Sequence, residues 1–340
     1  MGKHPGYWAA LGALAALTAF MGAVVGFGAF GTSIDADGAA VVEVRPGESF
    51  GALTGRLTGE GTLHHARFLL LLALLRGDTG RIKTGDYVFH GRVSPKGFLD
   101  ALVSGKGEFT AFTIPEGFSL RDMAARLEEE RLGDAQEFLR LSHDPAFIAS
   151  LNLPLRPAPP SLEGLVFPET YYLYRGVRES HLIQAMVRQF KQRAWPVLKA
   201  GEGRGLTPYQ ALILASIVEK ETGLDAERPL VSAVFHNRLR QGIKLGSDPT
   251  VIYGVPDFDG NLTRVHLRTP TPFNTYTQAG LPPTPIASPG LASIKAALAP
   301  APVAYLYFVS RGDGTHQFSS DYRTHERAVD RYQRHPKRGA

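Results

Sequence analysis

The chain has 340 residues, which is enough for about two domains, and its composition is that of an ordinary globular protein. It contains no cysteine, which excludes disulfides, thiol nucleophiles and cysteine-ligated metal sites. Much of the formal net charge of +5 comes from the tail at 327–338, so the composition gives little support to a nucleic-acid partner. The eleven histidines form no His-Glu-x-x-His pattern, and we expect neither a metal nor another cofactor.

The N-terminal segment 7–30 contains no charged residue and is long enough to cross a bilayer as a helix. Lys3 precedes it and acidic residues follow it, which predicts that residues 1–6 form a cytoplasmic stub and that the rest of the chain lies outside. A cleaved signal peptide is the alternative, but the apolar run is longer than a usual signal core and lacks a clear cleavage site. We therefore predict a single-pass protein of the cell inner (cytoplasmic) membrane, with a linker at 31–40.

Residues 41–107 are predicted to form a small αβ module. It opens with a strand and a Pro-Gly turn, continues with a helix that Ser49 caps, and later shows a turn and a short strand at 83–89. A related pattern of glycine, serine and helix returns at 117–127, within a strand–helix segment and connector at 108–160. The pattern resembles the LysM-type strand–helix unit that binds N-acetylglucosamine chains, and this resemblance implies a LysM-like module.

A helix with clear ends follows: Thr207 is its expected N-cap, Gln210 completes a capping box, and Gly223 lies just past its end. Its apolar side chains point in almost every direction, which is typical of a buried helix. Glu219 and Glu221 lie on roughly opposite sides of it. A carboxyl in apolar surroundings keeps its proton to higher pH, which suits a general acid, whereas the alternative is a buried ion pair with Arg or Lys. The helical wheel does not choose between the two acids.

Polar and aromatic motifs lie on both sides of this helix. A compact motif at 161–172 contains two acids and two adjacent tyrosines, and a short helix at 247–254 carries an acid and a tyrosine. A second long helix is predicted over 228–240, and its Arg238 is the candidate to neutralise Glu221. The stretch 269–290 holds six prolines but also ordered-looking aromatic residues, so it is more than a linker.

These motifs together resemble the endolytic murein transglycosylase (YceG-like) family. The matching segments are Ser161–Gly164, Phe167–Pro168, Ala215–Thr222, Val234–Leu239, Ser247–Val251, Asn274–Tyr276, Gly280–Pro283, Pro289–Gly290 and Tyr305–Val309. Glu169, Phe273 and Thr284 depart from the family pattern, where Asp, Tyr and Gly are usual. The resemblance implies an α+β fold with an N-terminal transmembrane helix, the LysM-like module and a larger α+β catalytic domain at 161–340.

The resemblance also implies roles for particular residues. The family's catalytic glutamate corresponds to Glu219, which leaves Glu221 as a structural acid. The residues that the resemblance implies around the substrate groove are Glu163, Asn237, Asp248, Tyr253, Asn274 and Tyr276. For each of these the alternative is a capping, turn or core role.

The implied activity is that of a lytic transglycosylase, which cleaves nascent glycan strands between N-acetylmuramic acid and N-acetylglucosamine, leaves 1,6-anhydro ends and terminates strand elongation. The implied partners are peptidoglycan strands, the membrane and peptidoglycan synthases (penicillin-binding proteins). Two alternatives remain: a noncatalytic peptidoglycan-binding scaffold, and a lysozyme-type hydrolase with Glu163 or Asp248 as the second carboxylate.

Overall fold

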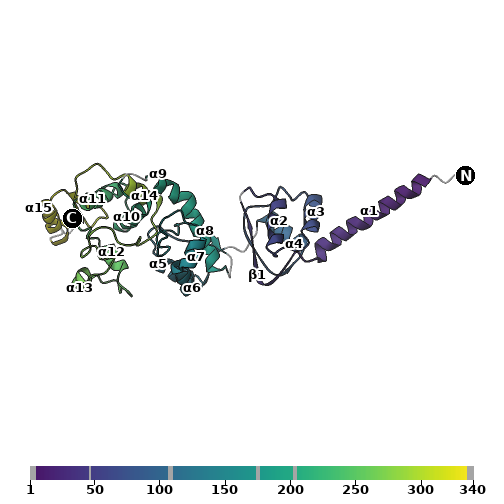
Figure 1. The fold of residues 1–340 in the computed structure, drawn as a ribbon, viewed down its shortest axis with the longest axis horizontal. Helices are drawn as coiled ribbons and strands as arrows, with labels where there is room; N and C mark the ends of the chain where they lie inside the picture. The colour runs from purple at the N-terminus through teal and green to yellow at the C-terminus, as the bar shows by residue number, and fades with distance from the viewer. Residues whose placement is uncertain (1–4, 46, 106–109, 174–176, 202–204, 335–340) are drawn as a thin grey trace. The chain divides into compact units, whose positions relative to one another are not determined.

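The computed structural model describes residues 5–45, 47–105, 110–173, 177–201 and 205–334, which divide into two compact units near Thr110 (Figure 1). Helices dominate the described residues, and their strands form three two-stranded sheets. The predicted α+β class is therefore confirmed.

The first unit is built on an antiparallel pair of strands, β1 (Ile34–Val44) and β2 (Gly85–Val93), with a register shift between Ala36 and Ala39. Two helices, α2 (Phe50–Gly59) and α3 (Ala66–Arg76), lie between these strands in the sequence, and α4 (Pro95–Ser104) follows them. The core is formed by fully buried side chains from every one of these elements, among them Val42, Leu53, Leu69, Tyr87 and Phe98.

Glycine and serine define the start of α2 as the sequence predicts. Gly47 has a φ of +76°, which favours glycine, and Ser49 caps the helix by accepting from the N–H of Ala52 at 3.2 Å. The related pattern in the second unit has the same geometry, with Gly117 at φ +80° and a capping box between Ser119 and Asp122. Local turn chemistry is therefore sufficient to predict both helix starts.

Helix α1 (Pro5–Phe30) corrects the prediction of a membrane anchor. In the part of the chain that the structure describes, no helix combines the length and the apolar character needed to cross a bilayer. The predicted span at 7–30 is therefore wrong, as is the single-pass inner-membrane location that depended on it. Residues 1–4 of the predicted stub lie outside the described residues.

Apolar side chains near the end of α1 pack within the first unit instead. Val24 is buried in its core, and the ring of Phe27 lies edge-on to His65 with 5.4 Å between centroids. A Cβ on Gly28 would lie 3.0 Å from a methyl group of Leu72, so glycine allows the helix to approach α3 closely. Strand β1 then begins at Ile34, within the stretch predicted as a linker.

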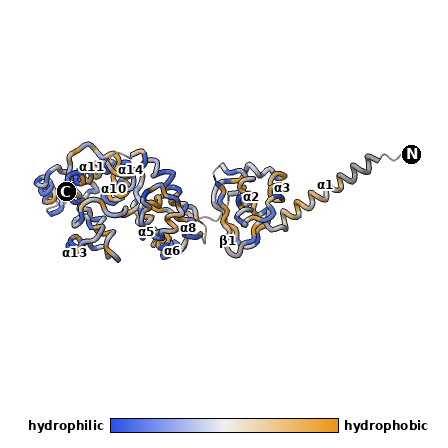
Figure 2. Tube along the Cα trace, in the orientation of Figure 1, coloured by the Kyte–Doolittle hydropathy of each residue, from blue (hydrophilic) through white to orange (hydrophobic). Residues whose placement is uncertain are grey.

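The second unit begins with a strand and a group of amphipathic helices. The elements up to residue 200 are β3 (Thr110–Thr113), α5 (Leu120–Glu129), α6 (Ala135–His143), α7 (Pro145–Ser150), β4 (Thr170–Leu173), α8 (Glu179–Gln189), the π-helical turn η1 (Phe190–Ala194) and α9 (Trp195–Ala200). Strand β3 pairs with β4. Hydrophobic residues gather around α5 and α8, where Leu127 and Ile183 are buried (Figure 2).

The rest of the second unit surrounds one helix. Its elements are α10 (Pro208–Glu221), α11 (Arg228–Arg240), α12 (Asp248–Tyr253), α13 (Arg264–Arg268), α14 (Leu291–Leu298), the antiparallel pair β5 (Tyr307–Ser310) and β6 (His316–Ser319), α15 (Tyr322–Val329) and the π-helical turn η2 (Asp330–Arg334). Helix α10 packs against α14, α11, α9 and α12, and every residue from 211 to 218 is buried. Its capping box between Thr207 and Gln210 forms as predicted.

Candidate active site

Glu219 lies in the last turn of α10 and accepts two hydrogen bonds. Its Oε2 accepts from the backbone N–H of Gly290 at 2.9 Å, and its Oε1 lies 3.3 Å from Nη2 of Arg228. Only 6% of the Glu219 side chain and 7% of the Arg228 side chain are exposed. The surroundings of this carboxyl are therefore polar rather than apolar, and the ion pair that the helical wheel left open is present.

Arg228 divides its donors between several partners. Its Nε donates to Oγ of Ser293 at 3.0 Å, and its Nη1 donates to the carboxylate of Asp225. Glu219 receives a single contact from this guanidinium rather than the paired contacts of a bidentate carboxylate–arginine bridge. The arginine is therefore fixed mainly by partners other than Glu219.

A second carboxyl, Glu116, lies beside Glu219. It is exposed, and it occupies the space over Gly290, where an added Cβ would lie 1.9 Å from its Oε1. Burial of part of the side chain raises the pKa of Glu116, and the negative charge of Glu219 raises it further. The sequence analysis missed this residue, although an acid before a glycine turn and a capping serine was visible as a candidate.

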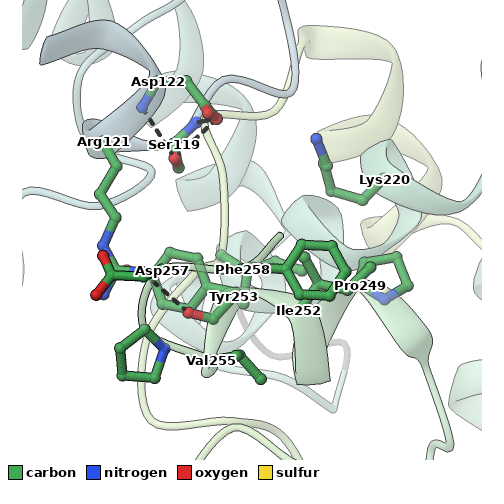
Figure 3. Close-up of a pocket in the computed structure, with 12 residues that line it drawn as sticks. Ser119, Arg121, Asp122, Lys220, Pro249, Ile252, Tyr253, Val255, Asp257 and Phe258 are labelled. Atoms are coloured by element: carbon green, nitrogen blue, oxygen red, sulfur yellow. Dashed lines mark hydrogen bonds between the residues drawn. The ribbon is translucent and has the colours of Figure 1, made fainter. Parts of the chain in front are cut away.

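A cleft of about 690 Å³ opens next to these acids (Figure 3). It is lined by Ser119, Arg121, Asp122, Lys220, Pro249, Ile252, Tyr253, Val255, Pro256, Asp257, Phe258 and Ile286. Lys220 follows Glu219 directly in α10 and lines the cleft, whereas Glu219 is not among the lining residues. Figure 3 shows Lys220 and Arg121 on different sides of the aromatic side chains of Tyr253 and Phe258.

Tyr253 is the residue of the predicted groove set that lines this cleft, and Glu163 fixes its position. The Tyr253 hydroxyl donates to Glu163 at 2.9 Å, and the guanidinium of Arg121 lies 5.7 Å from the centroid of the tyrosine ring. Glu163 is only 1% exposed and also accepts from the N–H of Leu120 at 3.2 Å. Burial raises the pKa of Glu163 to about 7. Glu163 thus does not line the cleft itself, but it holds Tyr253, which does.

Asp248 and Tyr276 form an exposed pair on the same unit. The Tyr276 hydroxyl donates to Oδ1 of Asp248 at 2.6 Å, and 39% of Tyr276 is exposed. Neither residue lines the cleft, but Pro249, the neighbour of Asp248, does. The pair is therefore next to the cleft and open to solvent.

Glu221 is bound by Ser247 rather than by arginine. Its Oε1 accepts from the Ser247 hydroxyl at 2.5 Å, and burial raises the pKa of Glu221 to about 7. Arg238, which the sequence analysis paired with Glu221, donates instead to the backbone carbonyls of Leu306 at 2.7 Å and Leu245 at 2.6 Å. The predicted Arg238–Glu221 ion pair is wrong because the guanidinium donates to loop carbonyls instead of to Glu221.

Asn237 and Asn274 are occupied with the backbone. The side-chain amide of Asn237 donates to the carbonyls of Val303 at 2.9 Å and Tyr305 at 2.7 Å. Asn274 is fully buried, and its amide donates to three carbonyls between residues 266 and 269. Both side chains hold loops together and neither reaches the cleft, which matches the turn role that was their alternative.

Comparison with known proteins gives consistent matches over most of the chain. The model of the YceG-like family matches residues 42–331. An endolytic murein transglycosylase of Bacillus subtilis (strain 168) is 26% identical over 303 residues, which cover 86% of this chain and 84% of that protein. A protein of the same name from Streptococcus pneumoniae serotype 2 (strain D39 / NCTC 7466) is 27% identical over 277 residues, 73% of this chain and 50% of that protein.

A solved structure has a related fold. The crystal structure of a YceG-like protein from Listeria monocytogenes aligns with a TM-score of 0.58 and 27% sequence identity. The alignment covers 85% of this chain and 99% of that chain.

Proposed function

Because the chain belongs to the YceG-like family, we propose that it is a peptidoglycan lytic transglycosylase and that Glu219 is its catalytic acid and base. The names of its relatives support the activity. The observation that carries the assignment to Glu219 is a nearly enclosed carboxyl that directly precedes Lys220, a residue that lines the cleft. The segment 161–340, which we propose as the catalytic domain, contains both Glu219 and most of the cleft.

The proposed reaction needs one carboxyl and no water. Protonated Glu219 gives its proton to the glycosidic oxygen as the bond from C1 of N-acetylmuramic acid breaks. The C6 hydroxyl of the same sugar attacks C1, and its proton passes to the Glu219 carboxylate, so the product ends in 1,6-anhydro-N-acetylmuramic acid. Between the two steps the carboxylate is negative, and the N–H of Gly290 and the guanidinium of Arg228 are oriented to stabilise that charge.

The lining of the cleft suits a glycan that carries carboxylates. Tyr253 and Phe258 supply aromatic surfaces on which a pyranose ring can stack. Lys220 and Arg121 supply cationic donors, and N-acetylmuramic acid carries a lactyl carboxylate or the peptide attached to it. We infer that the cleft binds the muramyl side of the cleaved bond. Asp248 and Tyr276, exposed beside the cleft, are proposed to contact the next sugar.

The first unit is proposed to bind glycan strands as a LysM-like module. The order of a strand, helices and a returning strand supports this assignment. Binding of long strands by this module fits an enzyme that cleaves nascent strands and ends their elongation. An association with peptidoglycan synthases stays a prediction.

The contacts around Glu163 and Asp248 argue against a lysozyme-type hydrolase that uses either of them as its second carboxylate. Glu163, one of the two acids considered as a second carboxylate, is buried behind Tyr253, and Asp248 is bonded to Tyr276. A noncatalytic scaffold would have no need of an acid held beside a cleft. Digestion of purified sacculi, followed by mass spectrometry of the strand ends, tests all three readings. Anhydro ends support the proposal, reducing ends indicate a hydrolase, and unchanged strands indicate a scaffold.

A further inference from the structure

We propose that Glu116 is a second carboxyl of the catalytic centre, which shares one proton with Glu219 and exchanges it with solvent. This inference rests on the proposed function of Glu219. The backbone positions Glu116, because its side chain has no hydrogen-bond partner among the described residues.

The turn that carries Glu116 is fixed by backbone hydrogen bonds on both sides. The N–H of Gly117 donates to the carbonyl of Ser288 at 2.8 Å, and the N–H of Ser288 donates to the carbonyl of Phe118 at 2.8 Å. Lys220, the neighbour of Glu219, donates from Nζ to the carbonyl of Gly117 at 3.1 Å. The turn is therefore joined both to the segment before α14 and to the end of α10, which places Glu116 beside Glu219.

Gly290 is where the two acids meet. Its N–H donates to Oε2 of Glu219 at 2.9 Å, while the Glu116 carboxyl fills the space of its missing side chain. Its φ of −74° is ordinary for any residue, so the backbone conformation does not require glycine here. The space that Glu116 occupies does require glycine, because an added Cβ at position 290 would lie 1.9 Å from an oxygen of the Glu116 carboxyl.

The charges around the pair give the two acids different roles. Glu219 and Lys220 face Glu116 from α10, Arg228 faces it from α11, and Asp225 faces it from the turn between these helices. The two groups that contact Glu219, the N–H of Gly290 and the guanidinium of Arg228, are hydrogen-bond donors, so the Glu219 carboxyl serves as their acceptor. Its side chain is almost enclosed. Glu116 is exposed, and its pKa is raised by burial and by the charge of Glu219, with Arg228 opposing this shift. Glu116 is thus the member of the pair that exchanges a proton with solvent.

The shared proton keeps the reaction balanced. It starts on the pair, passes through Glu219 to the glycosidic oxygen, and leaves with the departing hydroxyl. The C6 hydroxyl proton of the muramyl sugar then returns to Glu219 and so to the pair. One C–O bond breaks and one forms, and no water is consumed. Glu116 acts as a positioning and proton-sharing residue, while Glu219 acts on the substrate.

The test is the pH profile of kcat/KM for Glu116→Gln, with Glu128→Gln as an exposed matched control. We expect kcat/KM near neutral pH to fall by about 10²-fold, the lower limit of the range for a lost acid–base contribution. The alkaline limb should move to lower pH, because a neutral amide no longer repels the ionised neighbour. A wild-type rate and profile in Glu116→Gln would overturn the pair and leave the role of Glu219 intact, since that role is tested separately by Glu219→Gln.

A second variant examines the contact itself. Gly290→Ala keeps the N–H that binds Glu219 but fills the space of the Glu116 carboxyl. We expect it to reduce kcat/KM and to move the alkaline limb in the same direction as Glu116→Gln. In the double variant the second change should add little, because both changes remove one interaction. Losses that multiply would contradict the proposal, provided that circular dichroism shows each variant to be folded.

Discussion

The hydroxyl of Tyr253 donates to Glu163 at 2.9 Å, so an acid that is buried behind the cleft determines where a cleft tyrosine lies. The same carboxyl accepts from the N–H of Leu120 at the start of α5. One buried group therefore links two walls of the cleft. This relationship gives Glu163 a positioning role in place of the direct substrate contact that the sequence analysis expected.

Tyr253→Phe tests this link. Loss of the hydroxyl leaves the buried Glu163 with one partner fewer, and we expect the free energy of unfolding to fall by about 1–2 kcal/mol. The ring remains, so KM should rise only slightly. Denaturant unfolding and steady-state kinetics measure both effects. Tyr172→Phe is the matched control, because Tyr172 is 68% exposed. Equal stability of the two variants would contradict the role of Glu163.

The raised pKa values of Glu163 and Glu221 predict how stability depends on pH. Both lie at about 7 in the folded protein, against an ordinary value of 4.5. Between these values the folded chain binds more protons than the unfolded chain, so the free energy of unfolding falls as pH rises from 4.5 to 7. Each group contributes at most about 1.4 kcal/mol per pH unit.

Glu163→Gln and Glu221→Gln provide the check on this pH dependence. Each variant should flatten the decline in a series of denaturant titrations between pH 4.5 and 8, and the double variant should flatten it most. Because Glu221 is bound by Ser247, its amide replacement should retain the contact and keep most of the stability at acidic pH. An unchanged slope in the double variant would show that other groups cause the decline.

Glu219→Gln should abolish cleavage while the fold survives. The amide oxygen can keep one of the two contacts, either with the N–H of Gly290 or with Arg228, but the side chain no longer exchanges the proton that the reaction needs. We expect a loss of about 10²- to 10⁴-fold in the release of anhydro ends, with glycan binding retained. Mass spectrometry of sacculus digests and a melting curve give the two readouts. Retained turnover would remove Glu219 from its proposed role.

Arg121→Ala tests recognition of carboxylates in the cleft. The side chain is exposed, and an exposed ion pair is worth about 0.2–1 kcal/mol, so KM should rise by up to about fivefold with little change in kcat. The rise should vanish when the substrate carboxylates are esterified. Arg327→Ala, in α15, is the control. A KM equal to that of the control variant on the unmodified substrate would contradict a role for Arg121 in binding.

Residues close together in the sequence predicted the helices well, but they did not predict which side chains contact each other in the folded chain. The ends of α10 follow from Thr207, Gln210 and Pro208, which act within one turn of the helix, and the caps at Ser49 and Ser119 are equally local. These interactions depend on residues at most three positions apart, so a single sequence contains all that is needed.

Contacts between distant segments were not predictable in this way. The donor to Glu219 at Gly290 is 71 positions away, and the partners of Asn237 in the loop before β5 are 66 and 68 positions away. The pairing of Arg238 with Glu221 was wrong for the same reason, since the carbonyl of Leu306 comes within reach only once the chain has folded. The apolar run of α1 was likewise judged by composition, without the packing of Val24 and Gly28 in the first unit.

The reciprocal bonds between Ser288 and the turn at Gly117 and Phe118 involve only main-chain atoms. Any residue other than proline supplies the same amide and carbonyl at position 288, and any residue supplies the same carbonyl at position 118, so substitutions at these two positions preserve the bonds. The distance between Glu116 and α14 consequently does not depend on which side chains stand at most of these positions. Homologues that share only about a quarter of their residues with this chain can therefore inherit the same separation of these segments.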